Sequence, residues 1–299
     1  MPLHFVSGSN DGHRAALVAA LLGDASAAVH ATWGPTAPPS AWDLADGSEA
    51  LAPLEGGLRG LLIGLDLPGP VIGDLLAGAL PDDLRAMMAL AAGMSLDHAR
   101  TVVVEIPSAC DPATIVALPE RAARTFEALV PVVARWGVLV GPPAVGAVPG
   151  PGVEVLDALR QGACDLRALD ALICDSRTGI HHLAGTGPAA VATTAGLDVA
   201  LALMGRVRTR PARGDDPRSG GARVRRDGGR WSYEIDLPGL RAEDVELRRH
   251  DDELVLTCAG RRRTHLLPSV LRRCVVTRAG MRAGMLTLDM VPDEAVWPT

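Results

Sequence analysis

The sequence predicts an α/β domain with a mostly parallel sheet, followed by a small antiparallel β-sandwich, and three patterns lead to this prediction. A strand–loop–helix pattern opens the chain at residues 3–22, as in a βαβ unit. The β-branched run from Thr101 to Ile106 has the composition of a parallel strand buried on both faces. From Trp231 to Leu237 apolar and polar residues alternate, which is typical of a half-buried strand in an antiparallel sheet.

The first two thirds of the chain alternate expected helices with short expected strands. Apolar stretches that suit a helix occur at 14–22, 75–99, 118–133 and 153–172. A short strand is expected at 137–140, a loop at 179–187, and a helix followed by a strand at 188–204. Proline and glycine make the stretches 33–57 and 141–152 candidates for irregular structure.

A change of charge divides the chain into two predicted domains. Residues 1–207 contain 11 Arg and 21 Asp plus Glu, a net charge of -10, whereas residues 208–299 contain 18 Arg and 14 acids, a net charge of +4. Short apolar runs separated by turn residues follow the change and indicate a sandwich. We expect an α/β domain at 1–207, a linker at 208–221, a sandwich at 222–292 and a tail at 293–299.

Composition narrows the classes of function. All 29 basic residues are arginine, so no chemistry that needs a lysine amine is available. The net charge of -6 does not suggest a nucleic-acid binder. The 5 cysteines have no C-x-x-C spacing, which favours reduced thiols in a cytoplasmic protein and no metal site. No secretion signal is expected, and acidic residues and prolines interrupt the most apolar window, Leu61 to Leu80, so no transmembrane segment is expected either.

The tail contains motifs in a recognisable order: Tyr-Glu-Ile-Asp-Leu-Pro-Gly-Leu at 233–240, Glu-Leu-Val-Leu at 253–256, and Ala-Gly-Met-Arg-Ala-Gly-Met-Leu-Thr-Leu at 279–288. Together they resemble the HSP20-like (α-crystallin) domain of small heat-shock proteins; the alternative is an unrelated β-sandwich. In the motif Leu237, Pro238 and Gly239, the proline cannot donate to a ladder and the glycine permits a turn. The family's C-terminal I-x-I/V anchor is missing from 293–299, so the resemblance is to the form appended to bacterial ArsA-type ATPases.

Residues 102–120 align without a gap to the ArsA-type pattern V-V-V-D-x-A-P-T-G-x-T-L-R-L-L-x-L-P-E. This resemblance implies a P-loop-NTPase-like sheet with flanking helices for the first domain. The strand, the apolar helix and Leu118-Pro119-Glu120 match the family. The chemical positions do not match, because the aspartate linked to Mg²⁺ is replaced by Glu105 and A-P-T-G is replaced by residues 107–110.

The nucleotide loop of that family, G-K-G-G-x-G-K-T, is also altered. The vestigial loop comprises Ser7, Gly8, Ser9, Asn10, Asp11, Gly12, His13 and Arg14. Only Gly12 matches a family glycine; both lysines are lost, and Arg14 replaces the threonine that binds Mg²⁺. A carboxylate at Asp11 would repel phosphates, and the lysine charges that stabilise phosphoryl transfer are absent. The resemblance therefore implies a pseudo-ATPase with no catalytic residues and no cofactor, which pairs with itself or with an ATP-competent relative and acts as an interaction, regulatory or chaperone-like protein.

Other interpretations remain open at this point. The chain could be a divergent ATPase that binds ATP and Mg²⁺ through Arg14 and Glu105, or a holdase that works through the sandwich. Arg261, Arg262 and Arg263 would either contact an acidic partner or form a solvated hairpin. Cys110 would be either a reactive thiol or a buried spacer, and Gly205-Arg206 occupies the place of the family's base-reading pair.

Overall fold

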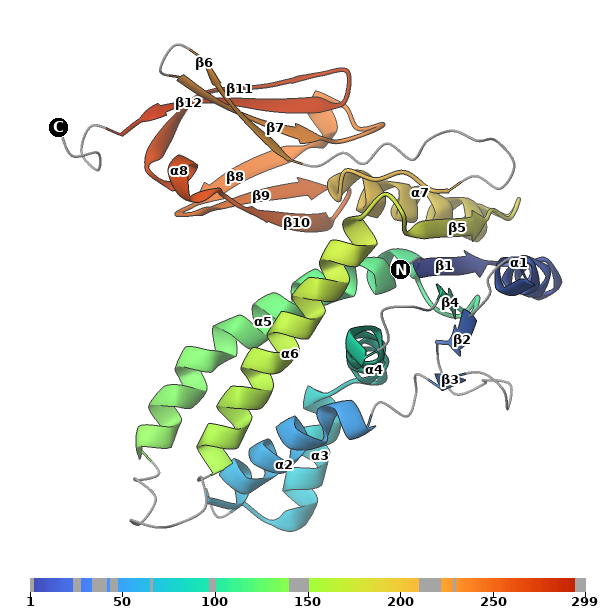
Figure 1. Cartoon of the computed structure of the whole chain (residues 1–299), viewed down its shortest axis with the longest axis vertical. Coiled ribbons are helices and arrows are strands. Elements are labelled where there is room, and N and C mark those ends of the chain that lie inside the picture. Colours follow the sequence, from blue (N-terminus) through green and yellow to red (C-terminus); the bar gives the residue numbers. More distant parts are fainter. Residues whose placement is uncertain are drawn as a thin grey trace. The chain divides into compact units, whose positions relative to one another are not determined.

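The computed structural model describes residues 3–23, 28–33, 42–43, 48–64, 67–96, 101–139, 151–209, 222–227 and 230–293. The chain divides into two compact units, Met1–Ile173 and Cys174–Thr299, and Figure 1 shows the order of their elements. The domain limits expected at 207, 221 and 292 stay predictions, and residues 210–221 and 294–299 lie outside the described part. In that part no helix is both long enough and apolar enough to cross a membrane.

Unit 1 contains a parallel sheet, as the sequence predicted. Its strands β1 (Leu3–Gly8), β2 (Ala28–Thr32), β3 (Trp42–Asp43) and β4 (Thr101–Glu105) lie in the order β3–β2–β4–β1. The central strand β4 pairs with β1 on one side and with β2 on the other, so Glu105 lies beside both Val6 and Thr32. The three valines of β4 are buried, which confirms that this run is a strand covered on both faces.

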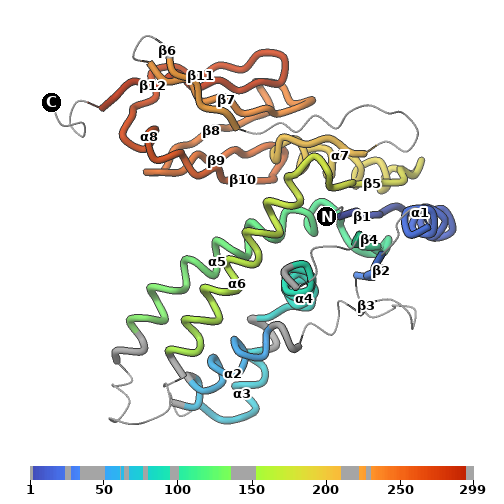
Figure 2. The backbone as a smooth tube through the Cα atoms, in the orientation of Figure 1, coloured from blue at the N-terminus to red at the C-terminus, as the bar shows by residue number. Residues whose placement is uncertain are grey.

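Six helices accompany the sheet in the described part of unit 1. They are α1 (Asp11–Gly23), α2 (Ser48–Gly64), α3 (Gly69–Ala79), α4 (Asp82–Leu96), α5 (Pro112–Leu139) and α6 (Pro151–Cys174). Helix α1 packs Val18 against Val6 and Val103 of the sheet. The two longest, α5 and α6, run side by side (Figure 2), and Arg167 of α6 donates two hydrogen bonds, of 2.9 and 2.7 Å, to Glu127 of α5.

Two local expectations for unit 1 were wrong. The strand expected at 137–140 is the last turn of α5 up to Leu139, because a short apolar run cannot distinguish a strand from the end of an apolar helix. The stretch from 48 to 57, expected to be irregular, belongs to α2. Leu51 and Leu54 are buried there, and packing of this apolar face outweighs the low helix propensity of proline and glycine.

Two adjacent glycines of α2 should respond in opposite ways to replacement by alanine. A Cβ at Gly57 would lie 3.0 Å from the backbone nitrogen of Val155 on α6, whereas a Cβ at Gly56 would meet nothing within 4 Å. We expect Gly57→Ala to destabilise unit 1 by about 1–3 kcal/mol through overpacking, and Gly56→Ala to stabilise it by about 0.5–1 kcal/mol through helix propensity. Urea denaturation of both variants measures the difference, and equal effects would contradict the close α2–α6 contact.

Unit 2 contains β5 (Gly179–Leu183), α7 (Pro188–Leu203) and a two-sheet sandwich. One sheet has the order β10–β9–β8, with β8 (Glu246–His250), β9 (Glu253–Cys258) and β10 (Arg261–Leu266). The other has the order β11–β12–β7–β6, with β6 (Arg223–Asp227), β7 (Arg230–Asp236), β11 (Cys274–Arg282) and β12 (Met285–Pro292). All pairs in both sheets are antiparallel, which confirms the predicted fold class.

Helix α7 contributes to the core of the sandwich. Leu203 is buried in one cluster with residues of both sheets, and Val199 packs against this cluster. Two expectations were wrong here, since residues 179–183 form a strand rather than a loop and residues 188–203 are helical without a following strand. Alanine-rich α7 is apolar on nearly every face, so its sequence alone does not show which core it joins.

Candidate functional site

The vestigial loop between β1 and α1 is short and closed by hydrogen bonds of its own. Only Ser9 and Asn10 separate the end of β1 at Gly8 from the start of α1 at Asp11. The side-chain Oδ1 of Asn10 accepts a hydrogen bond of 3.0 Å from the backbone N–H of His13. The backbone oxygen of Asn10 accepts another, also of 3.0 Å, from the N–H of Arg14. Asn10 thus acts as the N-cap of α1.

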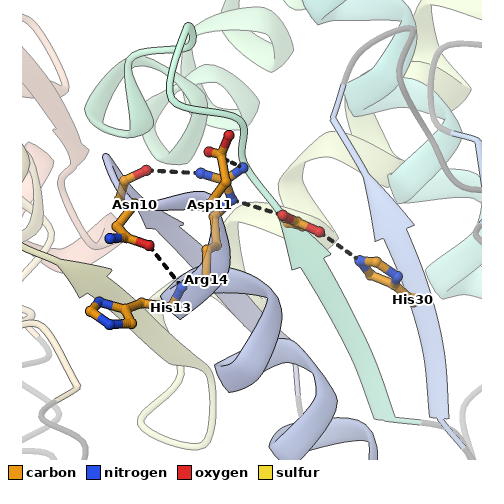
Figure 3. A network of polar contacts seen from close by, with 7 residues as sticks. Asn10, Asp11, His13, Arg14 and His30 are labelled. Atoms are coloured by element: carbon orange, nitrogen blue, oxygen red, sulfur yellow. Dashed lines mark hydrogen bonds and ion pairs between the residues drawn. The ribbon is translucent and has the colours of Figure 1, made fainter.

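Arg14 turns from the first turn of α1 toward the sheet and is 7% exposed (Figure 3). Its Nη1 donates a hydrogen bond of 2.9 Å to the backbone oxygen of Gly8, and its Nε donates one of 2.7 Å to Oε1 of Glu105. Its Nη2 forms an ion pair of 2.9 Å with Oδ1 of Asp11. The guanidinium therefore joins the vestigial loop, α1 and the central strand β4.

Glu105 continues the network to β2. Its Oε2 lies 3.1 Å from Nε2 of His30. These contacts thus link four side chains in the order Asp11, Arg14, Glu105, His30, of which Figure 3 labels Asp11, Arg14 and His30. The exposed fractions of the side chains are 78% for Asp11, 8% for Arg14, 16% for Glu105 and 17% for His30. Three of the four groups are thus largely withdrawn from water. Removing one member of a buried charged pair strongly lowers stability, because the other charge stays buried without a partner.

This arrangement does not fit Mg²⁺–ATP. A phosphate-binding loop directs amide N–H groups and a lysine at the phosphates and places a hydroxyl on Mg²⁺. Here the amide of His13 is bonded to Asn10, Arg14 donates to protein acceptors, and both carboxylate oxygens of Glu105 already have partners.

The other positions of the vestigial loop are mostly at the surface. Ser7 is 3% exposed at the end of β1, whereas Ser9 and Gly12 are exposed. A Cβ at Gly12 would meet only Oδ1 of Asn10, at an ordinary 3.5 Å. No close backbone approach therefore requires glycine at this position.

Two further residues singled out in the sequence, Cys110 and Arg206, lie in surroundings that favour a structural role. Burial and the negative charge of Asp83 raise the pKa of the Cys110 thiol, which opposes formation of a reactive thiolate. Arg206 is 1% exposed and donates hydrogen bonds to the backbone oxygens of Asp175 and Thr178, the latter at 2.6 Å. Arg206 therefore holds the turn before β5 and does not present a base-reading group.

The predicted interaction residues of the sandwich occupy different environments. Leu237 is fully buried in the core and its N–H donates to the oxygen of Gly284, whereas Gly239 is exposed with a φ of +81°. On β10, Nη2 of Arg263 lies 3.5 Å from Sγ of Cys174, and Arg261 lies against Gly196 of α7. Arg262 is exposed and Pro238 is half-buried. A role of these residues in contacts with a partner stays a prediction.

Two half-buried histidines should make the protein less stable in mild acid. Burial lowers the pKa of His4 on β1, and burial together with Arg208 lowers the pKa of His182 on β5. Each folded-state pKa lies below the unfolded value, so the unfolded chain binds more protons and stability falls as the pH drops through about 6.5. We expect the melting temperature to fall between pH 7.5 and 5.5, and His4→Gln with His182→Gln to weaken that dependence. An unchanged dependence in the double variant would contradict this assignment.

Comparisons with known proteins give a family for the C-terminal segment. Residues 228–290 match the family described as an HSP20-like domain found in ArsA. The uncharacterized protein SCO2128 of Streptomyces coelicolor is 28% identical over 281 residues, covering 73% of this chain and 72% of that protein. Protein Rv2184c of Mycobacterium tuberculosis is 42% identical over 69 residues, which amount to 23% of this chain and 16% of that protein.

Two solved structures are each similar to about a quarter of the chain. HSP18.5 from E. histolytica has 11% sequence identity and a TM-score of 0.21, covering 27% of this chain and 94% of that one. Heat shock protein 16.0 from Schizosaccharomyces pombe has 18% identity and a TM-score of 0.20, covering 25% and 67%. Both TM-scores are low, so the assignment depends on the family match alone. By this match, residues 228–290 resemble the HSP20-like domain found in ArsA, and the described strands of the segment form antiparallel sheets.

Proposed function

We propose that this protein is a non-catalytic pseudo-ATPase that acts by binding other proteins, in an interaction, regulatory or chaperone-like role. The observation that carries the proposal is the position of Arg14. Its guanidinium bonds to the backbone of the vestigial loop and to Glu105, the position that resembles the Mg²⁺-linked aspartate. An internal cation thus occupies the carboxylate that would face Mg²⁺ in a nucleotide complex.

The surroundings of Arg14 support the same conclusion. Asp11, at the start of α1, adds a negative charge where an active family member would receive phosphates. His13 replaces the lysine expected before the hydroxyl residue, and its amide is used in capping the helix. Both lysines and the hydroxyl of the family's loop are absent from this sequence, and the His13 amide and the Glu105 carboxylate are engaged within the protein, which supports the proposal.

The proposed partners are a second copy of the chain or an ATP-competent relative. The support is the resemblance of residues 102–120 to the ArsA pattern and the HSP20-like domain of the kind found in ArsA. In the cytoplasm, such a chain would regulate its partner by occupying the partner's interface without turning over nucleotide.

Calorimetric titration of the full chain with ATP and with ADP, each with and without Mg²⁺, tests the proposal. We expect no heat of binding and no shift in melting temperature. Micromolar binding that Arg14→Ala and Glu105→Gln both abolish would instead support the divergent ATPase. The surface variant Arg160→Ala, which changes an exposed pair with Asp157, is the matched control in unit 1.

A holdase working through the sandwich is the second candidate, and exposed apolar residues on its strands favour it. Leu266 is 60% exposed and Val275 is 41% exposed. If these side chains bind unfolded clients, the full chain should suppress aggregation of a heated model client, and Leu266→Ser with Val275→Ser should reduce that effect. No suppression at several-fold excess would exclude the holdase.

A further inference from the structure

The arginines of the sandwich are concentrated on the outermost strands of its two sheets. The outermost strands are β8 and β10 in one sheet and β6 and β11 in the other, and each contains at least two arginines. The central strands β9 and β12 contain none, and β7 has one at its first position. Charged residues on such edges discourage pairing with further strands of like charge.

The other three outermost strands each have further contacts inside unit 2, made by arginine side chains on β10 and β8 and by neighbouring elements on β11. On β10, Arg261 and Arg263 contact Gly196 and Cys174. On β8, Arg249 donates to the backbone oxygens of Cys274 and Arg272, at 2.5 and 3.2 Å. Strand β11 adjoins the 3-10 turn at Ala242–Asp244 and the short helix α8 at Ser269–Arg272.

The fourth edge, β6, is open in the described part of the chain. It pairs with β7 alone, and every residue from Ala222 to Arg226 is exposed. Arg225 forms an ion pair of 3.2 Å with Glu234, and Arg226 lies 5.2 Å from the ring centre of Trp231. Even in its ion pair the side chain of Arg225 remains 65% exposed, so its charge is available to a further partner.

The register of β6 defines which partner would fit. Arg223 and Arg225 lie opposite Glu234 and Ser232 on the outer face of the sheet. Val224 lies opposite the buried Tyr233, on the face toward the core. A strand added beside β6 would therefore place alternate side chains next to arginines and next to an apolar residue.

We propose that β6 binds an extended acidic segment of a partner protein, which adds to the four-stranded sheet as a fifth strand. The segment alternates acidic and apolar residues, so its carboxylates meet Arg223 and Arg225 and its apolar residues lie near Val224. Pairing of β6 with β6 of a second copy is disfavoured, because every antiparallel register that pairs three or more residues sets at least one arginine against another. This inference rests on the proposed role as an interaction protein and names the chemistry of its partner.

The test uses the full chain and a labelled peptide, acetyl-Thr-Glu-Val-Glu-Val-Glu-Val-Thr-amide, in a fluorescence anisotropy titration. We expect saturable binding that Arg223→Glu with Arg225→Glu weakens by about tenfold or more. The matched control, Arg278→Glu with Arg282→Glu, changes two exposed arginines on the opposite edge of the same sheet and should leave the affinity unchanged. A peptide with lysine in place of glutamate should not bind.

A peptide with N-methyl groups on alternate residues separates strand addition from general attraction of charges. It keeps the carboxylates but loses the donors of the ladder, and we expect it to bind much more weakly. Equal binding of the methylated peptide, equal losses in the two double variants, or no binding at all would overturn the proposal. None of these outcomes bears on the nucleotide titration, so this inference can fail while the proposed function stands.

Discussion

Replacing Arg14 with alanine is expected to lower the free energy of unfolding of unit 1 by about 3–5 kcal/mol, because it leaves a largely buried carboxylate without its cation. Glu105 is only 16% exposed and would retain a single side-chain partner, His30. Arginine and alanine both favour helices, so the change in α1 itself contributes little. The valines of β4 are buried beside this network. Hydrogen exchange of the β4 backbone amides therefore measures the loss of stability within unit 1.

Two further variants distinguish the charge network from packing. Arg160→Ala removes an ion pair whose side chains are 58% and 69% exposed, and such surface pairs contribute about 0–1 kcal/mol. The double variant Arg14→Met with Glu105→Gln removes both charges and should recover much of the lost stability. If Arg14→Ala is as stable as Arg160→Ala, Arg14 does not stabilise the fold, and a role in binding a ligand becomes the better explanation.

The second large effect is expected at Leu237, where alanine should destabilise unit 2 by about 2–5 kcal/mol by leaving a cavity. Leu237 is fully buried in the sandwich core with residues of both sheets. Chemical denaturation, with exchange of the β7 and β12 amides as a local probe, measures this effect. Leu266→Ala, at a residue that is 60% exposed, should stay within about 0.5 kcal/mol of the parent. A neutral Leu237→Ala would show that this residue is free to serve as an interaction position.

The fold class could be predicted from the sequence because its strongest signals are local. The valines of β4 and the alternation in β7 each fix the type of a strand, and the family match at 228–290 confirms the resemblance of the tail. Errors occurred where local signals are ambiguous or are outweighed by packing. Helix α2 forms despite Pro53, and β5 contains His181 at 6% exposed, although adjacent histidines are more often found in solvated loops.

The candidate site could be predicted only in part, for a physical reason. The sequence identified Arg14 and Glu105 as altered positions, but nothing in it indicated that the two side chains bond to each other across 91 residues. His30 was not expected in the network at all. Only the structure shows why it belongs there. In the register of β2 with β4, His30 lies opposite Val103, which is two residues from Glu105 and on the same face of the sheet.

The residues that match the family are fewer than the residues that build the sandwich core. The match begins at 228, yet Leu203 and Val199 of α7 are part of the sandwich core. A gene rearrangement that transferred only the matched segment would leave an apolar surface on the sandwich where α7 had packed. The unit that folds together therefore includes a helix outside the family match, and its boundary lies upstream of Pro188.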